Sequence, residues 1–187
     1  TYYKLEEYAL SIWSYEKALL IEPNFEDAKI NLELANLTLS DKVQELPRIA
    51  WWYYWQKFKG RFGVAGWTYL SVIFFWVLAF GLFLFLTKKK HSIKRLGVYF
   101  IVMGLLFAFF FGAIAWNKSY ALNNPKAAII TTSNVYVKSA PEAESADLFV
   151  IHSGLKVKLE DQIGEWLKVK LADGKMGWVQ ESELKRL

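Results

Sequence analysis

The sequence contains no cysteine and only two histidines among its 187 residues. Without cysteine, it cannot be a disulfide-stapled secreted module, a zinc ribbon or a thiol redox protein. Metal sites need several converging Cys, His or carboxylate side chains, and the sequence has no HxxxH, HxH or carboxylate cluster. Glycine-rich phosphate loops are also missing. We therefore predict no catalytic, cofactor-binding or metal-binding residues, and a protein that is not an enzyme.

His152 and Ser153 form the one pair that resembles part of a nucleophilic site. They lie on a β-type run, where neighbouring side chains point to opposite faces and cannot form a base-to-nucleophile hydrogen bond. We interpret His152 as a solvated surface residue.

The formal net charge of +5 comes from one short segment. Basic and acidic side chains nearly balance before residue 67 and after residue 115. The surplus consists of Lys88, Lys89, Lys90, Lys94 and Arg95. A nucleic-acid-binding face would spread its charge over a folded surface, so we predict no nucleic-acid partner.

Two long uncharged segments lie on either side of this basic loop, in a chain that is 54% hydrophobic and 18% aromatic. About 20 apolar residues in a helix cross the hydrocarbon core of a bilayer. We predict transmembrane helices at residues 67–87 and 96–116. The alternative is a pair of buried helices in a soluble protein, but neither segment has the polar stripe typical of such helices.

Lys and Arg in short loops are retained on the cytoplasmic side, so loop 88–95 should be cytoplasmic and set the topology. Both termini then lie in the periplasm of a bacterial inner-membrane protein. An alternative role for the loop is docking a cytoplasmic ATPase.

Amphipathic aromatic side chains gather beside the predicted spans, as is typical of the membrane interface. The predicted interface residues are Trp51, Trp52, Trp55, Trp67, Trp116 and Tyr120. We predict that residues 47–66 contain a short helix in this interface, with Arg48, Lys57 and Lys59 near lipid phosphates. A specific lipid-binding site is the alternative.

Gly104, Ala108 and Gly112 recur every four residues in the second span. Small side chains on one helical face allow another helix to approach closely. We predict helix packing at these positions, either against the first span or against a partner. No charged residue or histidine lies in either span, which disfavours an ion or proton path.

Residues 8–23 read YALSIWSYEKALLIEP, and residues 24–35 read NFEDAKINLELA. The spacing of Tyr15, Ala18, Leu19 and Pro23 resembles the second helix of a tetratricopeptide repeat (TPR), followed by the start of the next repeat. We predict TPR-like helices over residues 1–46, with the last helix continuing to Pro47. Because a stack needs about three repeats, we expect further repeats upstream. The alternative is an ordinary amphipathic helical hairpin.

After a linker at 117–126, residues 127–187 change to short alternating β-type runs. We predict strands at 128–131, 135–138, 149–151, 156–159, 166–171 and 176–180, with a hairpin turn at Asp173-Gly174. The segments VYVKSAP at 135–141 and GEWLKVKLADGKMGWV at 164–179 resemble bacterial SH3-like domains, which implies a small β-barrel that binds ligands. Tyr136, Trp166 and Trp178 line a possible ligand groove, or else belong to the core.

The order of these parts resembles the BatE family of the Bacteroides aerotolerance operon. The fold class is then a membrane protein of mixed α and β type, with TPR-like helices, a two-helix transmembrane hairpin and an SH3-like β-barrel. The resemblance implies a scaffold or adaptor in an envelope stress complex. Its implied partners are membrane lipid, von Willebrand A-domain membrane proteins and a MoxR-type AAA ATPase. A peptidoglycan-binding sensor is the alternative function.

Overall fold

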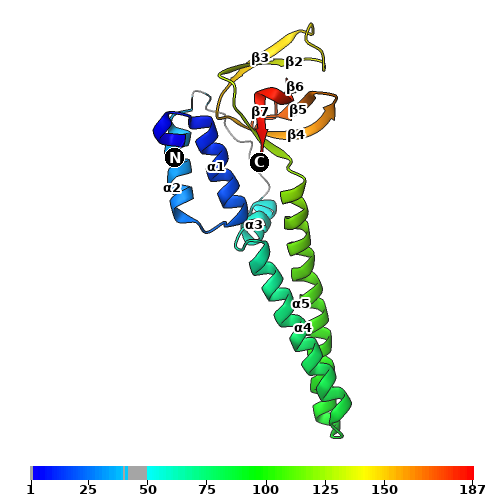
Figure 1. Ribbon diagram of the computed structural model, residues 1–187. Coiled ribbons are helices and arrows are strands. Elements are labelled where there is room, and N and C mark those ends of the chain that lie inside the picture. The colour runs from blue at the N-terminus through cyan, green and yellow to red at the C-terminus, as the bar shows by residue number, and fades with distance from the viewer. Residues whose placement is uncertain (1, 40, 42–49) are drawn as a thin grey trace. The chain divides into compact units, whose positions relative to one another are not determined.

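A computed structural model of the chain describes residues 2–39, 41 and 50–187. It contains two compact units (Figure 1). The first unit combines Thr1–Gln56 with Leu122–Leu187, and the second is Lys57–Ala121.

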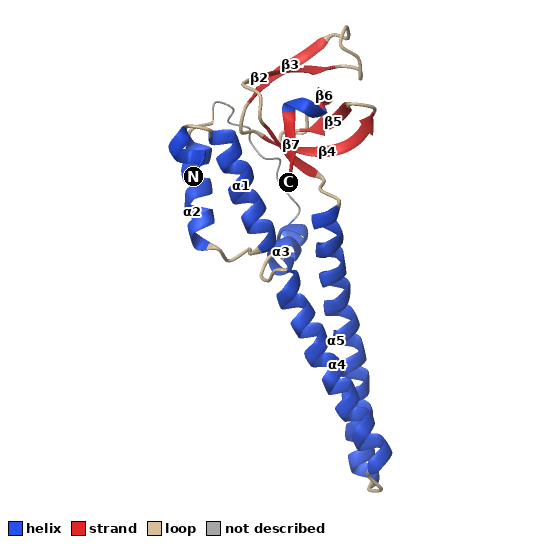
Figure 2. Cartoon of the chain, viewed as in Figure 1, coloured by secondary structure: helices blue, strands red, loops and turns tan. Residues whose placement is uncertain are grey.

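The carboxy-terminal part of the first unit is a β-domain, whose strands are red in Figure 2. Its seven antiparallel strands are ordered β3-β2-β6-β5-β4-β1-β7. Their bounds are β1 (Ala127–Ile130), β2 (Asn134–Lys138), β3 (Asp147–His152), β4 (Lys156–Ile163), β5 (Trp166–Lys170), β6 (Met176–Gln180) and β7 (Leu184–Arg186). The six predicted strands are confirmed. Strand β7 was not predicted, because its sequence Leu-Lys-Arg is too short and too charged to give a β-type pattern.

The core of the β-domain consists of side chains that alternate along the strands with exposed ones. Val135 and Val137 of β2 are fully buried, while Tyr136 between them is exposed. One cluster contains the buried side chains Ala128, Ile130, Val135, Val137, Ile151, Leu155, Val157, Leu167, Val169, Leu171, Val179 and Leu184. The predicted turn at Asp173-Gly174 joins β5 to β6, and Gly174 adopts a φ of 94°, which glycine adopts without strain.

The same unit contains the short helix η1 (Tyr2–Leu5) and a hairpin of α1 (Tyr8–Ile21) and α2 (Glu26–Leu37). The predicted helical pair on either side of Pro23 is therefore present. We predicted that this last helix continues to Pro47. That is wrong for the residues directly after Leu37, where α2 ends. The Thr38 hydroxyl donates to the Ala35 carbonyl, and Leu39 packs into an apolar cluster. Its predicted later positions, Val43 and Leu46, lie outside the described residues.

The α1–α2 hairpin packs directly on the β-domain. Ile12 and Ala35 from the helices share a buried cluster with Ile129 and Leu187. The Trp13 indole donates a 2.8 Å hydrogen bond to the carbonyl of Arg186. Two segments that we expected as separate domains thus share a core.

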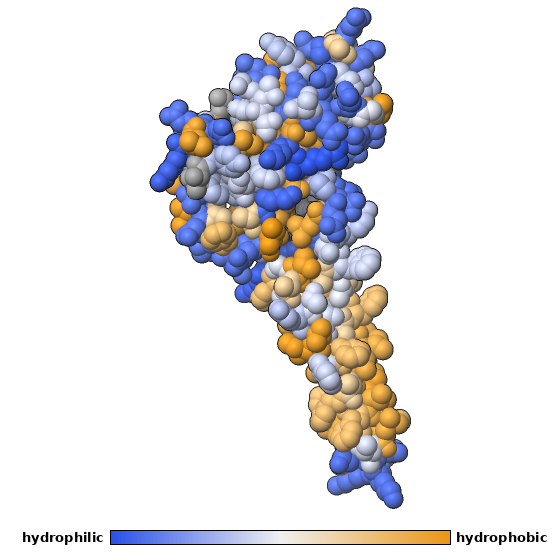
Figure 3. All heavy atoms as spheres, in the orientation of Figure 1, coloured by the Kyte–Doolittle hydropathy of each residue, from blue (hydrophilic) through white to orange (hydrophobic). Residues whose placement is uncertain are grey.

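The second unit is a hairpin of two long helices, α4 (Val64–Thr87) and α5 (His91–Asn123), and α3 (Ala50–Lys59) ends within it. Both long helices are long and apolar enough to cross a membrane. The hairpin surface is mainly hydrophobic, whereas its tip between α4 and α5 is hydrophilic (Figure 3). Helix α5 begins inside the expected loop 88–95 and continues through much of the expected linker 117–126. It stops before Asn124-Pro125, because proline disfavours helical backbone in the preceding residue.

Candidate functional site

An open groove of about 270 Å³ lies on the β-domain. Its lining consists of two aromatic rings, one lysine, two carboxylates and two neutral side chains. These are Tyr136, Lys138, Ala143, Asp147, Trp166, Gln180 and Glu183.

Four strands, the loop between β2 and β3 and a short helix position these side chains. Tyr136 and Lys138 point away from the core because they alternate with buried valines on β2. Trp166 at the start of β5 lies directly opposite Gln180 at the end of β6. Helix η2 (Glu181–Glu183) follows immediately, and the Glu183 carboxylate accepts a hydrogen bond from the Gln180 backbone N–H at 3.2 Å.

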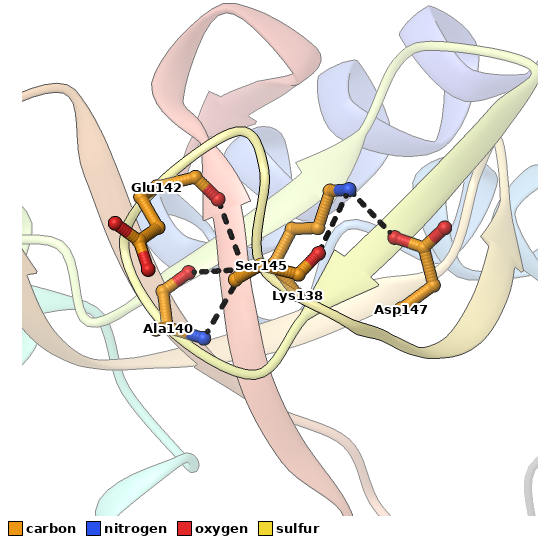
Figure 4. Close-up of polar contacts among 5 residues, drawn as sticks. All are labelled: Lys138, Ala140, Glu142, Ser145 and Asp147. Carbon is orange, nitrogen blue, oxygen red and sulfur yellow. Dashed lines mark hydrogen bonds and ion pairs between the residues drawn. The ribbon is translucent and has the colours of Figure 1, made fainter.

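One edge of the groove is the loop between β2 and β3 (Figure 4). The Ser145 hydroxyl lies 3.0 Å from the Ala140 carbonyl oxygen and 2.9 Å from that of Glu142. The Lys138 ammonium donates to the Ser145 carbonyl at 3.2 Å and pairs with Asp147 at 2.8 Å. These contacts tie the loop together and fasten it to Lys138, which in turn pairs with Asp147.

The charges in the groove are not all balanced. Asp147 pairs with Lys138, the one basic residue of the lining. Within the part of the chain that the structure describes, Glu183 has no basic partner. Partial burial raises the pKa of Glu183, and the hydrogen bond from the Gln180 N–H opposes this effect. The groove therefore contains one carboxylate that a bound cation would neutralise.

The structure brings two of the three predicted groove residues together. Tyr136 and Trp166 both line the groove. Trp178 does not: only 9% of its surface is exposed, and the Lys168 ammonium lies 5.9 Å from its ring centroid. Sequence alternation alone could not separate these roles, because Trp166 and Trp178 both lie within β-type runs.

The predicted small-residue face of α5 lies against α4. A Cβ on Gly104 would come within 2.5 Å of the Leu78 backbone nitrogen. The Ser71 hydroxyl donates to the Ala108 carbonyl at 2.9 Å, and a Cβ on Gly112 would lie 3.2 Å from the Ser71 hydroxyl oxygen. Helix α4 is thus the helix that this face packs against.

The contact between α4 and α5 also involves two glycines outside the predicted small-residue face. A Cβ on Gly81 would lie 2.7 Å from the Gly97 carbonyl oxygen, and one on Gly97 would lie 2.8 Å from that of Gly81. Gly97 and Gly104 are seven residues apart, a spacing that also places small residues on one helical face. That spacing is the signal that could have identified Gly97.

Most of the predicted interface aromatics are exposed. Trp51 and Trp52 on α3 and Trp116 and Tyr120 on α5 are all exposed. Trp55 is half-buried and stacks on Trp51, with ring centroids 6.3 Å apart.

Trp67 has a different environment from the other interface aromatics. Only 1% of its surface is exposed, and its ring contacts those of Phe58, Phe62 and Phe111. Its indole donates to the Lys59 carbonyl at 3.1 Å. Trp67 therefore packs the end of α3 onto the hairpin and has no surface left for a membrane interface.

Lys118 stabilises the same turn. Its ammonium donates to the carbonyls of Lys59 and Phe62, at 3.1 and 2.6 Å. At the other end of the hairpin, the predicted topology-setting residues Lys88, Lys89, Lys90 and Arg95 are exposed, and the ammonium of half-buried Lys94 lies 5.7 Å from the Phe85 ring centroid.

His152 has a partner that sequence reasoning missed. Its ring nitrogen Nδ1 lies 2.7 Å from one carboxylate oxygen of Asp41, and its backbone N–H donates to the other. These contacts join the segment after α2 to β3. Among the described residues, no group of three or more His, Asp or Glu side chains could hold a metal ion.

Comparison with known proteins identifies one region of the chain. Residues 133–185 match a family model described as the bacterial SH3 domain. A search of the curated proteins finds no match to the chain. The match spans β2 to β6, η2 and the first two residues of β7, including most of the groove's supporting structure. The carboxy-terminal β-domain is therefore a bacterial SH3-like domain.

Proposed function

We propose that the protein is a non-enzymatic, membrane-anchored scaffold whose SH3-like domain binds a protein segment. The observation that carries this proposal is the open groove, where Tyr136 is 56% exposed beside Trp166. Exposed aromatic rings in a preformed groove supply contact area at little cost in conformational entropy. The match to the bacterial SH3 domain supports a binding role.

The exposed apolar surface of the hairpin supports membrane anchoring. Phe109 is 78% exposed and Leu86 is 69% exposed, and many other apolar side chains of α4 and α5 are similarly uncovered. Soluble proteins rarely expose apolar patches this large. We propose that the two helices span a bacterial inner membrane, with loop 88–95 cytoplasmic and both soluble parts periplasmic.

The absence of cysteine makes this topology directly testable. Ser92→Cys lies near the hairpin tip, and Ser139→Cys lies on the exposed loop of the β-domain. In intact spheroplasts, a membrane-impermeant maleimide should label Ser139→Cys and leave Ser92→Cys unlabelled until the membrane is opened. The reverse pattern would invert the proposed topology.

We further propose that the scaffold belongs to an envelope stress complex of the BatE type. The order of helical hairpin, aromatic helix, two spans and SH3-like domain supports this. The partners would be von Willebrand A-domain membrane proteins and a MoxR-type AAA ATPase, with α1 and α2 as the last helices of a TPR array.

Purification in mild detergent from the native membrane tests the scaffold function. Mass spectrometry should recover A-domain membrane proteins or the ATPase with the wild-type chain. The double variant Tyr136→Ala with Trp166→Ala should reduce recovery at least tenfold. Met176→Ala is the matched control, because Met176 is an exposed apolar residue that does not line the groove. Equal recovery with the double variant would contradict binding through the groove.

Peptidoglycan binding is the second candidate function, favoured by the SH3 match and by the aromatic groove. Full-length protein in detergent should then co-sediment with purified peptidoglycan, and Trp166→Ala should abolish this. If the wild-type protein does not sediment with peptidoglycan, the peptidoglycan proposal fails.

A further inference from the structure

We propose that the groove of the SH3-like domain selects a positively charged side chain of a peptide. This inference rests on the proposed binding function and names the chemistry that the groove recognises. It follows from three features of the groove: its charge, its aromatic rings and its fixed shape.

The charge balance of the groove favours a cation. The ammonium of Lys138 is already held by the Asp147 carboxylate and the Ser145 carbonyl, and only 20% of this side chain is exposed. Asp147 remains half exposed, and a carboxylate has several acceptor positions besides the one that Lys138 occupies. Glu183 lacks a basic partner among the described residues. A positively charged ligand would pair with Glu183 and approach the free acceptor positions of Asp147, whereas an anionic ligand would be repelled by Glu183.

The aromatic rings of the groove also lack a cation. Elsewhere in the same unit, lysine ammonium groups lie over rings, at 3.8 Å from the Trp13 centroid and 5.9 Å from the Trp178 centroid. Within the described residues, no lysine or arginine occupies such a position over Tyr136 or Trp166. Rings beside carboxylates are the arrangement in which cation–π contact and ion pairing act on the same group.

The groove holds this arrangement before a ligand binds. Ser145 fixes the loop next to Asp147, and η2 fixes Glu183 through reciprocal bonds with Gln180 (Figure 4 shows the Ser145 loop). Because the carboxylates are already ordered, little side-chain entropy is lost on binding.

A titration of the full-length protein in detergent micelles tests the inference. The probes are three capped pentapeptides with glycine at four positions and lysine, norleucine or glutamate at the centre. The protein is labelled with fluorotryptophan, and the Trp166 signal is assigned with Trp166→Phe. The lysine peptide should shift this signal saturably and bind at least tenfold more tightly than the norleucine peptide. Added salt should weaken only the lysine peptide, because ion pairs are screened.

A charge-removing variant identifies the carboxylate involved. Glu183→Gln keeps an oxygen that can accept from the Gln180 N–H, and it should weaken lysine-peptide binding about fivefold without affecting norleucine. Glu160→Gln is the matched control, because Glu160 is an exposed carboxylate on β4 outside the groove. It should leave all three affinities unchanged. Should Glu183→Gln fail to fold, Tyr136→Leu at an exposed position serves instead, with the same selective loss expected.

The outcomes separate this inference from the proposed function. If norleucine binds as tightly as lysine, or if the glutamate peptide binds best, cation selection is overturned while groove binding stands. If no peptide shifts Trp166 and the groove variants still recover native partners, the proposed function of the groove fails as well.

Discussion

The β-domain and the helical hairpin use the same kinds of apolar side chain in opposite ways. In the β-domain, Leu167 and Val169 are at most 2% exposed and pack in a closed core. In the hairpin, Leu105 is 55% exposed, and Trp67 and Gly81 are the buried residues of α4. The β-domain encloses its apolar side chains, whereas the hairpin leaves most of its own exposed.

The two regions also pack differently. Branched side chains fill the core of the β-domain. The helices of the hairpin approach through backbone at Gly81 and Gly97, where even one added methyl group would collide. In lipid there is no hydrophobic force between helices, so close backbone contact has to supply the attraction. Close backbone packing of the two helices is therefore what the proposed membrane location of the hairpin requires.

Substituting leucine with alanine in each region should give the largest contrast. Leu167→Ala removes buried methyl groups and leaves a cavity, so we expect a loss of about 2 to 5 kcal/mol in the free energy of unfolding of the β-domain. Leu105→Ala should change stability by less than about 0.5 kcal/mol in detergent, because its side chain packs against few protein atoms. Urea titration of the intact protein, followed through methyl resonances of each region, measures both. Similar losses would mean that the hairpin has a closed core too.

Enlarging a glycine at the helix contact should destabilise the hairpin, although shortening an exposed leucine there should not. Gly81→Leu forces α4 and α5 apart, and we expect a cost of about 1 to 3 kcal/mol in hairpin stability. Gly112→Ala is the control, because its nearest neighbour is a movable serine hydroxyl at 3.2 Å. Spin labels at the exposed positions Tyr69 and Trp116 would report the separation of the helices during titration with dodecyl sulfate. An unchanged midpoint for Gly81→Leu would contradict backbone-to-backbone packing.

The sequence predicted the regions of the fold well because their patterns are local. Alternation in β2 predicts that Val135 and Val137 are buried and Tyr136 is exposed, and the structure has this arrangement. Long apolar runs predict α4 and α5 in the same way. The beginning and end of a helix depend on single residues, so the end of α2 at Leu37 was missed.

The contacts between distant segments could not be predicted from such patterns. Trp67 and Trp116 look alike in sequence, yet the first is buried by three phenylalanines and the second is exposed. Glu183 enters the groove only because η2 turns the chain after β6, and no periodicity indicates this turn. The contact between Asp41 and His152 joins residues more than a hundred positions apart, and no local pattern indicates it either.

Loosening the α1–α2 hairpin from the β-domain should have an intermediate effect. Trp13→Phe removes the hydrogen bond to the Arg186 carbonyl and weakens the contact with the Lys185 ammonium. We expect a loss of about 1 kcal/mol, seen as faster amide exchange at Leu187, whose N–H bonds the Ala127 carbonyl. Trp116→Phe, in the exposed surface of the other unit, should leave this exchange rate unchanged. Equal rates in both variants would show that the helices and the β-domain do not depend on each other.

Acid should act on the β-domain and not on the hairpin, because α4 and α5 contain no carboxylate. In the turn between β5 and β6, the Lys175 backbone N–H donates to Asp173 at 3.0 Å, and this bond lowers the pKa of Asp173. When the pKa of an Asp is lower in the folded state, its charge stabilises the fold at pH values above the ordinary Asp pKa. This stabilisation is lost as the pH falls through the folded-state pKa. Asp173→Asn keeps the turn preference, since Asn-Gly and Asp-Gly both favour a tight hairpin. It should therefore destabilise the β-domain slightly at pH 7 and not at all well below pH 4, about where an ordinary Asp titrates. The Val169 methyl signal in urea at the two pH values measures the difference, and a gap that persists at low pH would show that the charge of Asp173 does not stabilise the turn.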